Sequence, residues 1–102
     1  MWKMKGQKTM NRHFFITSHL QYRWAASKEM EKAILKAIMR FNAKDWGNIP
    51  DEDKRANNID LEQREGHVLG RYETPEGDIY IDMHFGHNGA EDQAVIMFCN
   101  EY

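Results

Sequence analysis

The clearest periodic segment of the chain begins at Ser27. Apolar residues then recur at spacings of three and four, which is typical of one face of an α-helix. Ser27 suits the N-cap position, and Glu29 and Glu31 place carboxylates in the first turn, where they favour the helix dipole. The spacing predicts a helix over residues 28–43 whose inward face consists of Met30, Ala33, Ile34, Ala37, Ile38 and Phe41.

A second helix is predicted over residues 51–64. Gly47 and Pro50 interrupt the first periodic pattern, and proline suits the first turn of a new helix. The acidic residues 51–53 would lie near the positive helix end, and the helix should end by Gly66. The residues that we expect to face inward are Ala56, Ile59 and Leu61.

After Gly66 apolar and polar residues alternate, as in half-buried strands. The strands are expected near residues 68–72, 79–85 and 94–99, with Gly-containing turns between them, and residues 13–18 form a further β-prone run. The pattern predicts an α+β fold with an antiparallel three- to four-stranded meander and two helices packed on one face. Residues 13–102 would form one domain, preceded by a flexible basic tail over residues 1–12.

Composition agrees with one cytoplasmic domain. The chain has 102 residues, of which 41 % are hydrophobic and 29 % charged, an ordinary globular balance. Cys99 is the single cysteine, so no internal disulfide forms and a reducing compartment is favoured. The basic N-terminus lacks the apolar run of a secretory signal, and no stretch approaches the ~18 apolar residues of a membrane span. The expected location is the cytoplasm.

Charge is divided unevenly along the chain. Residues 1–50 contain ten Lys/Arg and three Asp/Glu, a balance of +7, whereas residues 51–102 contain four and thirteen, a balance of −9. Such asymmetry either orients the protein towards a charged partner or lets the two halves attract each other in the fold. The acidic residues expected to be exposed at turns, and therefore to bind a partner, are Glu73, Glu76, Asp78, Glu91 and Asp92.

One basic stripe is expected on the first helix. Its members follow one another at intervals of four residues, so they share a face. The simplest interpretation is a solvated helix surface, and the alternative is a contact with nucleic-acid phosphates. The stripe consists of Lys28, Lys32, Lys36 and Arg40.

A candidate metal site lies at the end of the expected strand 79–85. Asp82 and His84 point to the same side of a strand, and Gly86 would turn the chain so that His87 approaches them. Two imidazoles and a carboxylate suit Zn²⁺ and leave a coordination position open, with His67 or Cys99 as a further ligand. Histidines and acids are also common on solvated strand faces.

No complete catalytic motif is present, and the apolar surroundings of Cys99 favour an inert thiol, so the chain is not expected to be an enzyme.

The Asp45-Trp46-Gly47 turn has a structural explanation of its own: Trp46 would anchor the turn in the core and Gly47 would adopt a positive φ. Together with other short segments, this turn also resembles the small plasmid-related proteins carried on bacterial plasmids, integrative elements and phages. The resemblance implies a mobile-DNA setting rather than a chemistry. The remaining segments are Glu52-Asp53-Lys54, Asn57, Val68–Tyr72, Ile79–Ile81 and Glu101-Tyr102.

Three functions follow from these features. The first is a binding protein that inhibits a host defence nuclease, of the anti-CRISPR type, by placing its acidic surface in the nucleic-acid groove of a Cas effector. The second is a small metal-dependent regulator or enzyme built on Asp82, His84 and His87. The third is a nucleic-acid-binding accessory protein that uses the basic stripe.

Overall fold

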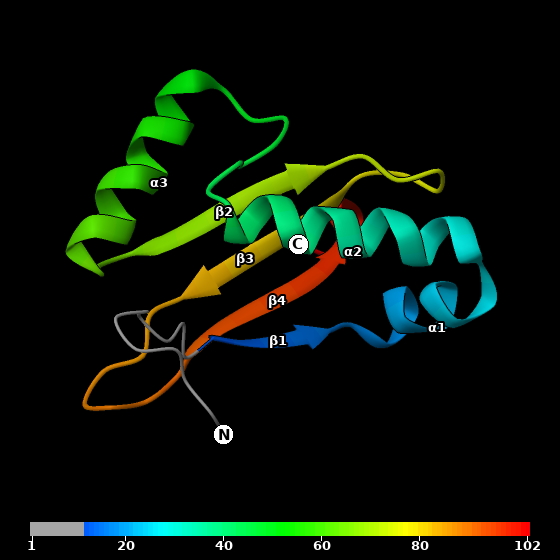
Figure 1. The fold of residues 1–102 in the computed structure, drawn as a ribbon, viewed down its shortest axis with the longest axis horizontal. Coiled ribbons are helices and arrows are strands. Elements are labelled where there is room, and N and C mark those ends of the chain that lie inside the picture. Colours follow the sequence, from blue (N-terminus) through cyan, green and yellow to red (C-terminus); the bar gives the residue numbers. More distant parts are fainter. Residues whose placement is uncertain (1–11) are drawn as a thin grey trace.

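The computed structural model describes residues 12–102, and it contains three helices and one four-stranded sheet. The α+β prediction is confirmed, and both predicted helices are present within two residues of their expected ends. Figure 1 shows the order along the chain: β1 (Arg12–Ile16), α1 (Ser18–Ala26), α2 (Lys28–Asn42), α3 (Asp51–Gln63), β2 (His67–Tyr72), β3 (Ile79–His84), β4 (Asp92–Phe98) and a final 3-10 helix (Cys99–Glu101).

The sheet is mixed, so the prediction of a purely antiparallel sheet is wrong. Strands β2, β3 and β4 form the expected antiparallel meander, but β1 pairs in parallel with β4 and the strand order is β1-β4-β3-β2. The reason is the connection after β1. This strand leads directly into α1 rather than into a hairpin turn, and the chain returns to β1 only with its last strand.

Helix α1 was not predicted from the sequence, because its apolar pattern is weak. Leu20 is its only buried residue, and its N-cap, Thr17, makes no capping hydrogen bond through its side chain. Contacts with α2 hold it instead, including the indole Nε1 of Trp24, which donates to the Glu31 carboxylate over 3.1 Å. This helix therefore depends on tertiary packing more than on its own sequence.

The core lies between α2 and the sheet. Helix α2 crosses one face of the sheet (Figure 1), and its buried residues Met30, Ile34, Ala37 and Phe41 belong to the predicted inward face. They share one cluster with alternate strand residues, among them Val68, Tyr72, Ile79, Ile81, Met83, Ala94 and Ile96. Of the intervening positions in β2, β3 and β4, all but the buried Asp82 are partly or fully exposed, so the second face of the sheet is largely open. We call it the open face.

Helix α3 lies along the β2 edge of the sheet (Figure 1). Its one buried residue is Asn57, whereas Ala56 and Ile59, expected to face inward, are exposed and Leu61 is partly buried. The Asn57 amide donates to the Leu69 carbonyl (2.8 Å) and accepts from the Leu69 amide (3.3 Å). A polar clamp on the strand edge therefore holds α3 in place, and no apolar stripe is needed.

The turn before α3 has the structure that its residues predict. The Trp46 side chain is buried, with 3 % of its surface exposed, and its ring lies 5.2 Å from that of Phe41. Gly47 has a φ of 78°, and its amide donates to the Asp45 carboxylate over 3.1 Å. Gly47 also forms an isolated bridge with Arg71 of β2, so this turn fastens the helices to the sheet.

The predicted tail lies almost wholly outside the described residues. Of the expected residues 1–12, only Arg12 is described, and it is the first residue of β1. Between residues 12 and 102, the helices all lack the length and apolar character that a membrane span needs.

Candidate metal centre on the open face of the sheet

Three potential metal ligands lie next to one another on the open face. Strand pairing places His67 of β2 directly opposite His84 of β3, and Asp82 opposite Leu69. Since residues two apart on a strand point to the same side, Asp82, His84 and His67 share one face. The turn between β2 and β3 fixes this register, because it pairs Tyr72 with Ile79.

The carboxylate of Asp82 lies close to both imidazoles. Its Oδ1 atom is 2.8 Å from Nδ1 of His67, and its Oδ2 atom is 3.4 Å from Nε2 of His84. The two imidazole rings stack at a centroid distance of 5.4 Å with an interplanar angle of 13°. One ligand atom from each of the three residues lies within 4.8 Å of the other two. We call these residues the His-Asp-His site.

The three side chains differ in exposure. The Asp82 side chain is 10 % exposed, whereas those of His67 and His84 are 44 % and 63 % exposed. A nearly buried carboxylate is costly unless a donor or a cation compensates for its lost hydration. The arrangement therefore places a poorly solvated anion between two imidazoles that remain accessible from solvent.

The site agrees only in part with the one expected from the sequence. Asp82 and His84 belong to it, but His87 does not, and His67 takes the third place. The loop after β3 is fastened elsewhere, because the Gly86 amide donates to Asp92 (2.9 Å) and the Gly86 carbonyl accepts from Arg64 (3.3 Å). His87 therefore lies exposed in that loop, and hairpin register is the signal that identifies His67.

Cys99, the other ligand considered, lies outside the site. It follows Phe98, which pairs with Ile79 at the opposite end of β3 from His84. Burial raises the pKa of the Cys99 thiol, which agrees with the expected inert cysteine.

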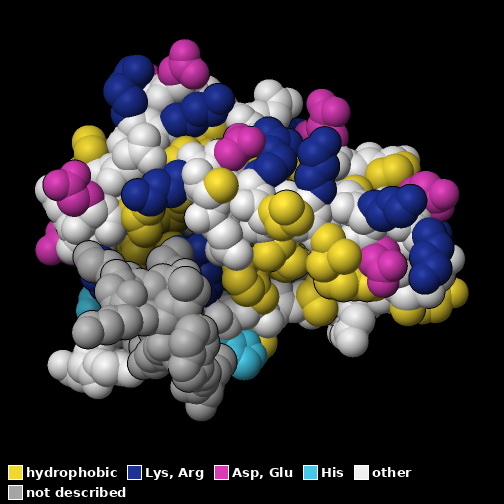
Figure 2. Space-filling view, viewed as in Figure 1, with side chains coloured by type: hydrophobic (Ala, Val, Ile, Leu, Met, Phe, Trp, Pro, Cys, Tyr) yellow, Lys and Arg dark blue, Asp and Glu magenta, His cyan; other side chains and the backbone are white. Residues whose placement is uncertain are grey.

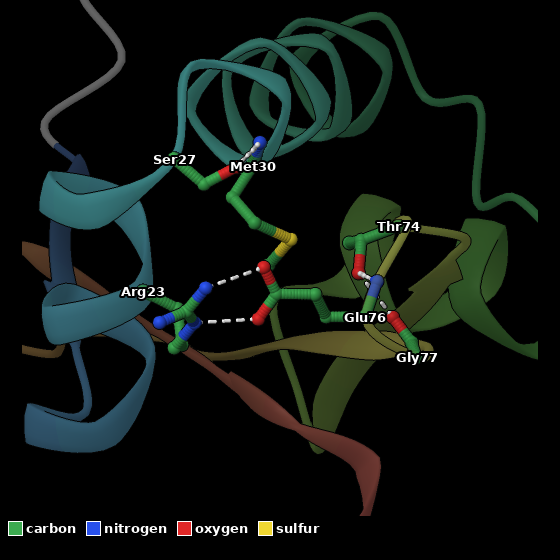
Figure 3. Close-up of polar contacts among 6 residues, drawn as sticks. All are labelled: Arg23, Ser27, Met30, Thr74, Glu76 and Gly77. Atoms are coloured by element: carbon green, nitrogen blue, oxygen red, sulfur yellow. Dashed lines mark hydrogen bonds and ion pairs between the residues drawn. The ribbon is translucent and has the colours of Figure 1, made fainter.

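Two of the acidic partner-binding candidates form ion pairs at the turn between β2 and β3. Arg23 of α1 donates two hydrogen bonds to Glu76, 2.6 and 2.9 Å long (Figure 3). The Thr74 hydroxyl accepts a hydrogen bond from the Glu76 amide and donates one to the Gly77 carbonyl. The hydrogen bonds from Arg23 lower the pKa of Glu76. Asp78 accepts from Arg71 over 2.8 Å.

The expectation that Asp92 is exposed is wrong. Asp92 is buried, with 8 % of its surface exposed, and accepts hydrogen bonds from Arg64 and from the Gly86 amide. Glu91 is exposed with its carboxylate 3.4 Å from the His13 ring, and Glu73 is exposed. Partner binding by the acidic residues stays a prediction, and Glu73 and Glu91 are its most accessible members.

The basic stripe lies on the outer side of α2. Lys32 and Lys36 are exposed, Lys28 approaches Glu31 to 3.8 Å, and Arg40 forms a bidentate pair with Asp45. Figure 2 shows acidic side chains interspersed with the basic ones along this helix. Such a mixed surface is typical of a solvated helix face.

A comparison of the chain with protein-family models, with curated proteins and with solved structures finds no match.

Proposed function

We propose that this protein binds a divalent metal ion of the zinc class at the His-Asp-His site. The observation that carries the proposal is the approach of the three ligand atoms from His67, Asp82 and His84 to within 4.8 Å of one another. Two imidazoles and one carboxylate form a common ligand set for zinc sites that keep a coordination position open.

The spacing of the side chains suits such an ion after small rotations. Ligand atoms around a tetrahedral zinc ion, at bonds of about 2.0–2.1 Å, lie about 3.3 Å from one another. The His67 Nδ1–Asp82 Oδ1 distance is 2.8 Å and the His84 Nε2–Asp82 Oδ2 distance is 3.4 Å, and one ligand atom from each residue lies within 4.8 Å of the other two. Neighbouring strands hold all three backbones, so rotation of the side chains alone would adjust the site.

Burial separates this cluster from an ordinary solvated group of histidines and acids. A surface carboxylate would be hydrated, whereas Asp82 is nearly buried beside Leu69 and Val95 in the sheet. The His67 imidazole already forms a hydrogen bond of 2.8 Å with this carboxylate, and a divalent cation bound between the two would take over this role of offsetting its lost hydration. A metal ion could reach the site from solvent because the imidazoles of His67 and His84 are exposed. The coordination position that the three residues leave open would take a water molecule or a bound ligand.

Calorimetric titration of chelator-treated protein with Zn²⁺ tests the proposal. We expect one equivalent to bind to the parent, and removal of one ligand by His67→Ala, His84→Ala or Asp82→Asn should weaken binding by about 10-fold or more. Parallel titrations with Fe²⁺, Mn²⁺ and Ni²⁺ rank the metals for the same site, since this ligand set also suits other divalent ions.

His87→Ala is the matched control, since it removes an exposed imidazole from the neighbouring loop but not from the site. It should bind Zn²⁺ like the parent. The proposal fails if the parent binds no stoichiometric metal. It also fails if His87→Ala loses the ion while His67→Ala retains it, because the site would then be the one expected from the sequence.

A further inference from the structure

A cleft of about 320 Å³ lies beside the His-Asp-His site, between α3 and β2. His67 belongs to both, because its side chain is one of the three ligands and also lines the cleft. The apolar part of the lining consists of Ile49, Ala56 and Leu69. A ligand in this cleft would therefore rest on an apolar wall with one end next to the proposed metal ion.

The α3 wall of the cleft is acidic, with Asp60 at the end next to Gly66 and His67. Asp53 and Asp60 of α3 line it, seven residues and hence about two helical turns apart on one face. Neither carboxylate forms an ion pair with any residue between 12 and 102. Asn57 also lines the cleft, but its amide is occupied by the Leu69 backbone. It holds the two walls together and leaves the carboxylates as the free polar groups of α3.

Tyr102 connects the cleft to the site. It lines the cleft, and its ring lies 5.1 Å from that of Tyr80 on the open face. Its side chain therefore lies between the cleft and the open face, where its hydroxyl would be available to a ligand that reaches the metal.

We infer that this cleft is the ligand site of the proposed metal centre, and that it takes a small molecule with a metal-coordinating oxygen at one end and an ammonium group at the other. The inference rests on the proposed metal binding. A cation at the His-Asp-His site would attract an anionic or neutral oxygen donor, and the two carboxylates would attract a positive charge. The volume is at the lower end of the range for small-molecule pockets, which favours a ligand of amino-acid size.

Two hydroxamates that differ by one amino group provide the test. Hydroxamates coordinate zinc through oxygen, and 6-aminohexanohydroxamate carries an ammonium group that hexanohydroxamate lacks. In calorimetric titrations of zinc-loaded protein, we expect 6-aminohexanohydroxamate to bind at least about 10-fold more tightly than hexanohydroxamate. The reason is that its ammonium group can form a charge-assisted hydrogen bond to a carboxylate. Asp53→Asn, at the end of the cleft away from Gly66 and His67, should reduce this preference, while zinc affinity and the far-UV circular dichroism spectrum stay unchanged.

Glu62→Gln is the matched control, because Glu62 is an exposed acid of the same helix outside the cleft lining; it should keep the full preference. Equal affinity of the two hydroxamates for zinc-loaded parent would overturn the inference and leave the metal site intact. Absence of zinc binding in the parent, measured beforehand, would instead overturn the proposed function itself.

Discussion

Arg64 donates two hydrogen bonds, 2.6 and 3.1 Å long, to the carboxylate of Asp92, which lies 28 positions further along the chain. Arg64 follows the end of α3 in a left-handed conformation with φ 55°, and Asp92 is the first residue of β4. The same carboxylate accepts from the Gly86 amide over 2.9 Å. One buried carboxylate therefore joins the end of a helix, a loop and the start of a strand.

The first prediction concerns the stability that Asp92 provides. Asp92→Ala should lower the free energy of unfolding by about 2–4 kcal/mol, because it leaves the Gly86 amide and part of the Arg64 guanidinium without a partner. Asp92→Lys should cost more, since it places a cation next to Arg64. Urea denaturation measures both, with Glu91→Gln as the exposed neighbour expected to change by under about 0.5 kcal/mol. A loss in Asp92→Ala as small as in that control would contradict the role.

The second prediction concerns acid. Burial opposes ionisation of Asp92, but the hydrogen bonds from Arg64 and from the Gly86 amide outweigh it and lower the pKa of Asp92. Because the folded pKa lies below the unfolded one, the stabilisation is complete above about pH 4 and is lost as the pH falls through the folded pKa. Urea melts below pH 4 should therefore show a shallower loss for Asp92→Asn than for the parent. If the free energies of unfolding of the parent and of Asp92→Asn fall in parallel as the pH is lowered, Asp92 makes no such contribution.

The third prediction concerns the tryptophan of the turn before α3. Trp46→Ala should lower the free energy of unfolding by about 3–5 kcal/mol, as expected for a large aromatic ring removed from a core. Trp46→Phe keeps an aromatic ring but loses the hydrogen bond from Nε1 to Asn58 (2.9 Å), so we expect a smaller loss of about 1–2 kcal/mol. A loss below about 1 kcal/mol in Trp46→Ala, measured by chemical denaturation, would be inconsistent with a buried indole.

The fourth prediction separates steric overlap from backbone strain by comparing two glycines. Gly47 and Gly77 both have positive φ, 78° and 116°. A Cβ at Gly47 would lie 2.0 Å from the Arg71 carbonyl oxygen, whereas a Cβ at Gly77 would meet nothing within 4 Å. Gly77→Ala should cost about 1–3 kcal/mol from strain. Gly47→Ala should cost at least about 2 kcal/mol more, since it also forces Gly47 away from Arg71. Equal melting temperatures of the two variants would exclude a tight contact between this turn and β2.

Local signals in the sequence were sufficient for α2, the turn before α3 and the antiparallel hairpins. The apolar spacing from Met30 to Phe41 and the N-cap Ser27, whose hydroxyl accepts from the Met30 amide, act within a few residues of one another. The glycine at position 47 likewise indicates, without any distant contact, that the backbone adopts a positive φ there. The alternation from Val68 onwards identified strands because the helix-facing side of the sheet is buried. Asp82 and His84 could be paired for the same reason, since the period of a strand is two residues.

Contacts between distant parts of the chain decided the rest. The parallel pairing of β1 with β4 joins residues about 80 positions apart, and no local pattern encodes the direction of such a pairing. Helix α1 depends on packing against α2, and α3 is held by Asn57 on the edge of β2. The sequence predicted an exposed Asp92 at a turn, whereas in the fold Asp92 is buried and accepts hydrogen bonds from Arg64. His67 joined Asp82 and His84 because hairpin register brought β2 beside β3. In each case the deciding free energy comes from packing, ion pairing or hydrogen bonding between elements, which acts only once the chain has folded.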